Sequence, residues 1–157
     1  MTDATEPKVQ DGRERRMVLR LLEFWRAAKG DASFAAPAQL DEVAMPELYP
    51  HCIVLDVAQN PGDPVVTAIG RTISSYADGN LKGLPISRFD TNTLPAHAVA
   101  YVGEVLRKGV PISRGGSFVD KRGTSILYRS IVVPLAEDGE TVTAVIAAAN
   151  CREVAGT

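Results

Sequence analysis

The last third of the sequence, residues 110–150, most constrains what the chain can fold into. Apolar and polar residues alternate there between turn signals, which is typical of consecutive antiparallel strands. We expect strands over residues 112–119, 124–135 and 141–149, with Gly123 supplying a positive φ in the first connection. A meander of this size has one face to bury. The remaining residues must therefore supply the layer that covers this face and any further strands.

Two helices and a hairpin are predicted upstream of this meander. Apolar residues recur at spacings of three and four in residues 13–29, which indicates an amphipathic helix, and Gly30 ends it. Residues 93–108 show the second helical pattern, with a proline in the first turn. Two strand-like runs, residues 51–57 and 64–69, are separated by a strong turn signal and predict a hairpin.

Shorter helices are expected within residues 40–49 and 71–76, and residues 1–12 form a polar leader that we expect to be disordered. The element order is then one helix, two strands, the remaining helices and three strands. A five-stranded antiparallel sheet with its helices gathered between the second and third strands assembles these elements economically. The sequence therefore predicts an α+β fold.

Length and composition suit one globular domain. The 157 residues are 45% hydrophobic, and the formal net charge of −2 gives no general attraction to nucleic acid. No apolar run approaches the roughly 20 residues that a membrane helix needs, so we expect no integral membrane segment. The two cysteines, Cys52 and Cys151, lack metal-ligand spacing and predict free thiols in a reducing compartment. A cytoplasmic location is the expectation.

The wide apolar stripe of the first helix requires a partner surface. It can dock on the sheet of its own chain or pair with the same helix of a second chain, and the sequence leaves both open. Burial of such side chains yields roughly 1.5–3 kcal/mol each, which is enough for association if they are exposed in the monomer. We predict a homodimer whose interface includes Met17, Leu21, Leu22 and Trp25.

Four segments together resemble a bacterial family of PAS-like domains that carries an N-terminal helix. They are residues 22–26 (LEFWR), 53–57 (IVLDV), 69–73 (IGRTI) and 128–135 (YRSIVVPL). The order and spacing of these segments carry the resemblance, which spans residues 19–153. The second strand departs from the family, because residues 64–69 lack the basic residues that usually precede the glycine.

The resemblance implies a PAS-like five-stranded antiparallel sheet in the order 2-1-5-4-3, with central helices on one face and an N-terminal amphipathic helix. It divides the chain into a leader (residues 1–12), an N-terminal helix (13–30) and a single PAS-like domain (31–154). Because the first strand then lies beside the last, Cys52 and Cys151 should be near neighbours. A sensory or protein-interaction role is also implied.

Catalysis is not expected. His51 and His97 are the only imidazoles, and neither has a nucleophile or carboxylate in a sequence context that suggests catalysis. The glycine pair at residues 115–116 lacks the strand-to-helix setting of a phosphate-binding loop. A flavin-adduct photosensor of the PAS fold needs a cysteine in the helical middle, and none lies between Cys52 and Cys151.

The candidate ligand site lies between the predicted helix at residues 93–108 and the sheet. Haem-binding PAS domains use a histidine on the corresponding helix, which makes His97 a candidate iron ligand, whereas a partly exposed helix histidine is the plainer interpretation. The candidate site residues are His97, Tyr101, Tyr128, Arg129 and Tyr76. The sequence requires no cofactor and leaves haem as one alternative.

Two function classes follow. The first is a stand-alone signalling and regulatory module that acts by protein–protein interaction, as a homodimer and on a protein partner in a signalling pathway. The alternative is a small-molecule or haem sensor whose ligand lies between residues 93–108 and the sheet. The small residues Ala144, Ala147 and Ala149 predict either close approach of the helix, and then no ligand, or a hollow beneath it.

Overall fold

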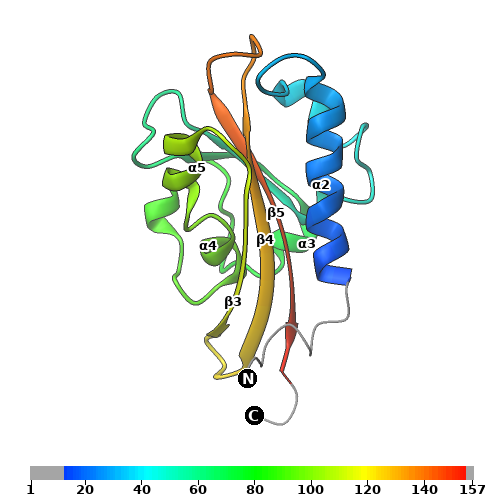
Figure 1. The fold of residues 1–157 in the computed structure, drawn as a ribbon. Coiled ribbons are helices and arrows are strands. Elements are labelled where there is room, and N and C mark those ends of the chain that lie inside the picture. Colours follow the sequence, from blue (N-terminus) through cyan, green and yellow to red (C-terminus); the bar gives the residue numbers. More distant parts are fainter. Residues whose placement is uncertain (1–12, 155–157) are drawn as a thin grey trace.

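The computed structural model describes residues 13–154, which form one five-stranded antiparallel sheet with helices on both faces (Figure 1). The strands are β1 Cys52–Asp56, β2 Val65–Ile69, β3 Ile112–Val119, β4 Ser125–Leu135 and β5 Ala144–Glu153. Their order is β2-β1-β5-β4-β3, and each neighbouring pair is antiparallel. This order confirms the predicted α+β fold of PAS-like type. The predicted leader, residues 1–12, lies outside the described residues.

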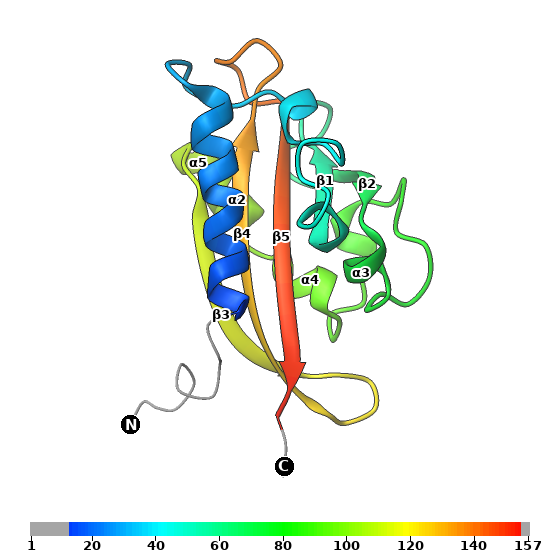
Figure 2. The same cartoon turned by 90° about the vertical axis from the view of Figure 1, so that its right-hand side faces the viewer.

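The longer helices lie on opposite sides of the sheet. α2 (Arg13–Lys29) packs on β4 and β5 from one side, and α4 (Leu94–Ala98) and α5 (Val102–Lys108) pack from the other (Figure 1, Figure 2). We call these two sides the α2 face and the α4–α5 face. The remaining helical elements are the short segments η1 Pro37–Leu40, η2 Tyr49–His51, α3 Arg71–Ser74 and η3 Ile86–Arg88.

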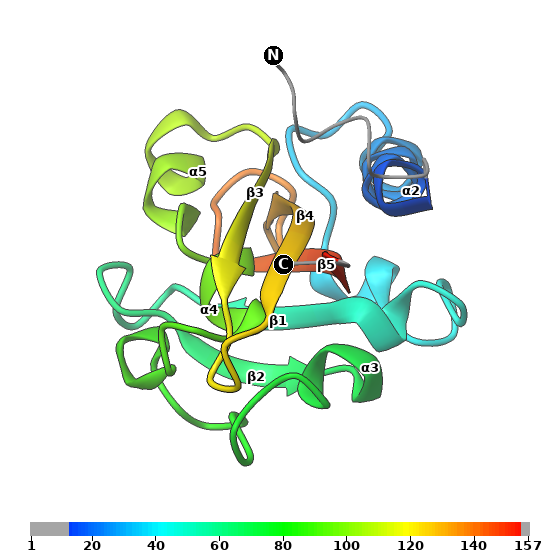
Figure 3. The ribbon, with the colours of Figure 1, turned by 90° about the horizontal axis from the view of Figure 1, so that it is seen from below.

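Strand alternation divides the core into two apolar clusters on opposite sides of the sheet. Ile131 and Ile146 pack in the cluster beneath α2, whereas their neighbours Val132 and Ala147 pack in the cluster beneath α4 and α5. Seen from below, α2 and α5 lie on either side of β4 (Figure 3). Because β4 and β5 are buried on both faces, their sequences are nearly continuous apolar runs in the middle of each strand.

α2 buries its apolar stripe against its own sheet. Met17 is 8% exposed, Leu21 0% and Trp25 6%, and Leu22 is half-buried in the same cluster. The indole N–H of Trp25 also donates a hydrogen bond of 2.7 Å to the main-chain carbonyl of Pro134. We therefore correct the dimer interface predicted at Met17, Leu21, Leu22 and Trp25 to a contact within the chain, because the sheet already covers the surface that association needed.

The predicted helix over residues 93–108 is broken into α4 and α5. Val99 ends α4 with φ −111° and ψ 7°, and Tyr101 precedes α5 with φ −107° and ψ 21°. Each residue turns a helix by about 100°, so in a continuous helix Val99 would lie about 140° around the axis from Leu94, away from the sheet. The break allows both side chains to be buried, with 1% of Leu94 and 2% of Val99 exposed.

Residues 40–49 do not form the predicted short helix. η1 ends at Leu40, and the backbone that follows makes turns in which the Met45 N–H donates to the Asp41 carbonyl. Met45 precedes Pro46, and a proline disfavours the helical conformation in the residue before it. The turn is therefore not continued into a helix.

The two cysteines lie on neighbouring strands but do not face each other. Cys52 on β1 is paired with Ala148 on β5, and Cys151 lies three residues further along β5, about 10 Å at the rise of a strand. Cys52 packs in the cluster beneath α2, whereas Cys151 packs against the cluster on the α4–α5 face. The predicted neighbourhood of the first and last strands is confirmed, the two cysteines are close but not directly opposite each other, and both residues are free thiols.

Candidate functional site

His97, on α4, packs its ring in an aromatic cluster. The imidazole stacks on Phe118 of β3 with ring centroids 4.3 Å apart and an interplanar angle of 11°. Tyr128 of β4 completes the cluster, with its ring centroid 5.3 Å from that of His97. Burial lowers the pKa of His97 below its ordinary value, so the imidazole is mostly uncharged at neutral pH. The structure thus brings together two of the predicted site residues, His97 and Tyr128.

Tyr101 is held in the interior by contacts within the chain. Its hydroxyl shares a hydrogen bond of 2.6 Å with the hydroxyl of Ser130, and both residues are buried. Burial raises the pKa of Tyr101 to about 12, although the hydrogen bond to Ser130 acts in the opposite direction. The guanidinium of Arg114 lies 5.0 Å from the Tyr101 ring centroid and forms an ion pair with Glu104. Ser130 and Arg114 therefore contact the groups of Tyr101 that a ligand would use.

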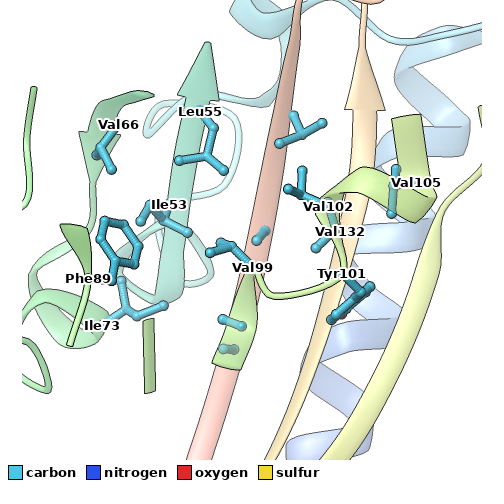
Figure 4. Packing of buried hydrophobic residues seen from close by; sticks show 14 of the residues in the cluster. Ile53, Leu55, Val66, Ile73, Phe89, Val99, Tyr101, Val102, Val105 and Val132 are labelled. Atoms are coloured by element: carbon cyan, nitrogen blue, oxygen red, sulfur yellow. The ribbon is translucent and has the colours of Figure 1, made fainter. Parts of the chain in front are cut away.

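Apolar side chains from the helices and from the sheet fill the space between them (Figure 4). Ala98 of α4, Val105 of α5 and Ala147 of β5 are 0% exposed, which leaves no water-sized gap beside these side chains. Ala147 and Ala149 share the α4–α5 face, whereas Ala144 lies on the α2 face. Small side chains on both α4 and β5 let the helix approach the strand closely. Of the two predicted alternatives, close approach of the helix or a hollow beneath it, the structure shows close approach.

Haem does not fit the predicted place between α4 and the sheet. A porphyrin there would displace Ala98 and Ala147, which are fully buried. Across residues 13–154, no group of three or more His, Cys, Asp or Glu side chains is placed to hold a metal ion. The same part of the chain contains no helix with the length and apolar character that crossing a bilayer requires.

The other two predicted site residues lie elsewhere. Arg129 follows Tyr128 on β4, and successive side chains of a strand point to opposite faces, so Arg129 lies on the α2 face. Tyr76 lies just beyond α3, is 44% exposed and lines an open groove. The predicted site is therefore corrected. His97, Tyr101 and Tyr128 share the α4–α5 face, Arg129 is on the opposite face, and Tyr76 belongs to the groove.

The groove has a volume of about 490 Å³ and adjoins the aromatic cluster. Phe118 belongs to both, since its ring stacks on His97 and also lines the groove. The lining residues come from four separate segments, within residues 75–78, 92–94, 118–126 and 151–153. Because these segments meet only in the folded chain, no local pattern in the sequence could identify the groove.

Charged side chains around the groove are paired with one another. Lys121 contacts both Asp78 and Asp90, the latter at 3.0 Å. Arg122 lies 3.5 Å from Glu153. Exposed ion pairs of this kind each contribute only about 0–1 kcal/mol to stability. Their pairing mixes both signs of charge at the rim, so the groove does not present one sign to a charged ligand.

No family model matches the sequence, and a search of curated proteins finds no match. Among solved structures, the chain is similar to the light-state LOV domain of the blue-light photoreceptor Aureochrome1, with 14% identity over 74% of this chain and 90% of that chain and a TM-score of 0.49. It is similar to the LOV domain of a blue-light activated histidine kinase from Erythrobacter litoralis, with 10% identity over 66% of this chain and 95% of that chain and a TM-score of 0.48. It is also similar to a PAS domain of an HTR-like protein from Haloarcula marismortui, with 14% identity over 66% of this chain and 84% of that chain and a TM-score of 0.40.

The architecture of the chain itself carries the fold assignment. The sheet order β2-β1-β5-β4-β3 is the one that the sequence resemblance implied. The helical segments between β2 and β3 include α4 and α5, which close one face of this sheet. The protein therefore has the PAS fold.

Proposed function

We propose that the protein is a signalling and regulatory module that acts through protein–protein contacts as a homodimer, with no ligand between its helices and its sheet. The packed interior beneath α4 and α5 carries this proposal, because Ala98, Val105 and Ala147 are fully buried there. A small-molecule sensor needs a concave site that buries its ligand. With that space closed, the module acts on other proteins through its surface.

The polar groups on the α4–α5 face support a role without catalysis. The imidazole of His97 packs on the rings of Phe118 and Tyr128. The hydroxyl of Tyr101 is engaged by the hydroxyl of Ser130 at 2.6 Å. Contacts of this kind position side chains for packing, and a nucleophile with an adjacent general base would show a different arrangement.

The test of this function uses the purified full-length chain. We expect no absorption band in the visible range, no small molecule released on denaturation, and a mass by light scattering of twice the chain mass of 16.8 kDa. A coloured protein, or a stoichiometric compound identified by mass spectrometry, would contradict the ligand-free proposal and favour the sensor alternative. A mass of one chain at every protein concentration would contradict the homodimer.

Ala147→Leu tests the packed interior directly. The larger side chain has no room beneath α4, so the free energy of unfolding should fall by about 1–3 kcal/mol. Ala58→Leu is the matched control, because Ala58 is exposed and the same change there should stay within about 0.5 kcal/mol. Urea denaturation followed by circular dichroism gives both values. Equal effects at the two positions would mean that the space beside Ala147 is hollow in solution.

A further inference from the structure

β3 forms an open edge of the sheet. It pairs with β4 from Ile112 to Val119 without a register shift, and within residues 13–154 no other strand pairs with its outer side. The backbone N–H and C=O groups on that side are a template for a further strand. Proteins usually protect such an edge by a short strand, prolines, lysines, a bulge or a covering segment.

The opposite edge of the sheet is protected in these ways. β2 is five residues long, and its pairing with β1 contains a register irregularity. Residues 83–86 also cover its outer side. The Val66 N–H donates to the Leu84 carbonyl at 3.0 Å, and the Gly83 N–H donates to the Val66 carbonyl at 2.8 Å. β2 is therefore closed to another strand.

β3 carries little of this protection. Its eight residues, ISRGGSFV, include no proline and no lysine. Its single charged residue, Arg114, points to the α4–α5 face, where its guanidinium is neutralised by Glu104 and lies over the ring of Tyr101. Val119, at the end of the strand, is 56% exposed, and Val110, two residues before its start, is 47% exposed. A long, regular edge strand without proline or lysine, near exposed apolar side chains, indicates a docking surface.

The hydrogen-bond register shows which residues face the open edge. At the turn between β3 and β4, the Asp120 N–H donates to the Thr124 carbonyl at 2.9 Å, so these residues form a hydrogen-bonded pair. Hydrogen-bonded and non-hydrogen-bonded pairs alternate along an antiparallel ladder. The N–H and C=O groups of Ser113, Gly115 and Ser117 therefore point away from β4 toward the open edge.

We propose that a second copy of this chain pairs with β3 in antiparallel orientation about a two-fold axis at Gly115. The inference rests on the proposed homodimer and names its surface. In this register Ser113 of one copy lies opposite Ser117 of the other, and Gly115 lies opposite its own counterpart. The outward-facing N–H and C=O groups of these residues are then paired, and the two sheets continue into one.

The side chains of β3 are self-complementary in this register. The long side chain of Arg114 lies opposite Gly116 of the second copy, which has no side chain. The apolar side chain of Ile112 lies opposite that of Phe118. An axis at Arg114 would instead place like charges directly opposite, which is destabilising. These matches favour a second copy over a strand of a different protein.

Disulfide cross-linking tests this register. The variant Ser113→Cys/Ser117→Cys, made with Cys151→Ser, places facing thiols on residues whose Cα atoms lie about 5.5 Å apart, a separation that a disulfide spans. Cys52 does not react, because it is buried and burial raises the pKa of its thiol to about 12. We expect a cross-linked dimer on oxidation.

The matched control is Ser113→Cys alone, again with Cys151→Ser. In the proposed dimer, the thiols introduced at this position in the two copies lie about 13 Å apart along the paired strands and should not cross-link. Light scattering separates the outcomes. A dimer in solution without cross-linking of the double-cysteine variant would overturn the β3 interface and leave the homodimer standing. A monomer would overturn both the β3 interface and the homodimer, and a strand of a different protein would then be the candidate partner of the β3 edge.

Ser117→Pro gives a second test that does not depend on cysteine chemistry. Proline removes the outward N–H at this position but no hydrogen bond to β4, so the circular dichroism spectrum should be kept. The dissociation constant of the dimer should rise on the order of tenfold or more. Ser117→Thr keeps the N–H and should leave the constant unchanged. Equal dissociation constants for the two variants would also overturn the β3 interface.

Discussion

Replacing Trp25 with alanine should lower the free energy of unfolding by about 3–5 kcal/mol. The indole anchors α2, since it is 6% exposed and its N–H donates to the Pro134 carbonyl at 2.7 Å. Alanine removes the ring from the cluster beneath α2 and leaves a buried carbonyl without its donor. Urea denaturation followed by circular dichroism measures the change, because Trp25 is the single tryptophan and its fluorescence is lost in the variant.

Two further variants separate packing from hydrogen bonding. Trp25→Phe keeps an aromatic ring but removes the N–H donor, and should cost about 1–3 kcal/mol. Leu19→Ala shortens a side chain of α2 that is 48% exposed, and should stay within about 0.5 kcal/mol. If Trp25→Ala cost no more than Leu19→Ala, α2 would not be docked on its own sheet in solution. Its apolar stripe would then be available to a second chain.

Docking of α2 restricts where two copies can associate. α2 packs over β4 and β5 on one side, and α4 and α5 pack over the same sheet on the other. Both faces of the central strands are then covered within one chain, which leaves the outer edge of β3 as the open backbone of the sheet. The proposed dimer is therefore held by main-chain hydrogen bonds, and the apolar stripe of α2 contributes to the stability of the monomer instead.

The strands and the first helix are predictable because their signals are local. The predicted segments at residues 13–29 and 112–119 coincide with α2 and β3. The last strand is displaced, since β5 runs from Ala144 to Glu153 and not over residues 141–149. The carboxylate of Asp138 accepts hydrogen bonds from the N–H groups of Glu140 and Thr141, which extends the turn before β5.

The break between α4 and α5 could not be predicted from periodicity. Residues 93–108 show a helical pattern, and the break is favoured only because Val99 gains a buried position against a sheet that is formed elsewhere in the chain.

The placement of Arg129, in contrast, could have been predicted correctly from the sequence. Tyr128 and Arg129 are neighbours on a predicted strand, so alternation already assigns them to opposite faces. The groove near Phe118 depends on four distant segments and has no sequence signal.

Gly70→Ala should lower the free energy of unfolding by about 3 kcal/mol, the upper end of the range for added groups in packed sites. Gly70 joins β2 to α3, and its N–H donates to the Cys52 carbonyl at 2.8 Å. A Cβ at this position would lie 2.3 Å from the carbonyl oxygen of Tyr49 and 2.4 Å from that of Pro50. Both contacts are with backbone atoms, so the junction of β2 and α3 would have to move away from η2.

Gly103→Ala is the matched control for Gly70→Ala, because a Cβ at Gly103 in α5 would meet no atom of the surrounding fold within 4 Å. Alanine in a helix is favoured over glycine by about 0.5–1 kcal/mol, so this variant should be more stable than the parent. Identical changes at the two glycines should thus move the unfolding free energy in opposite directions in the same urea titration. A neutral Gly70→Ala would mean that η2 separates readily from Gly70, and the β2–α3 junction would then not be a fixed part of the fold.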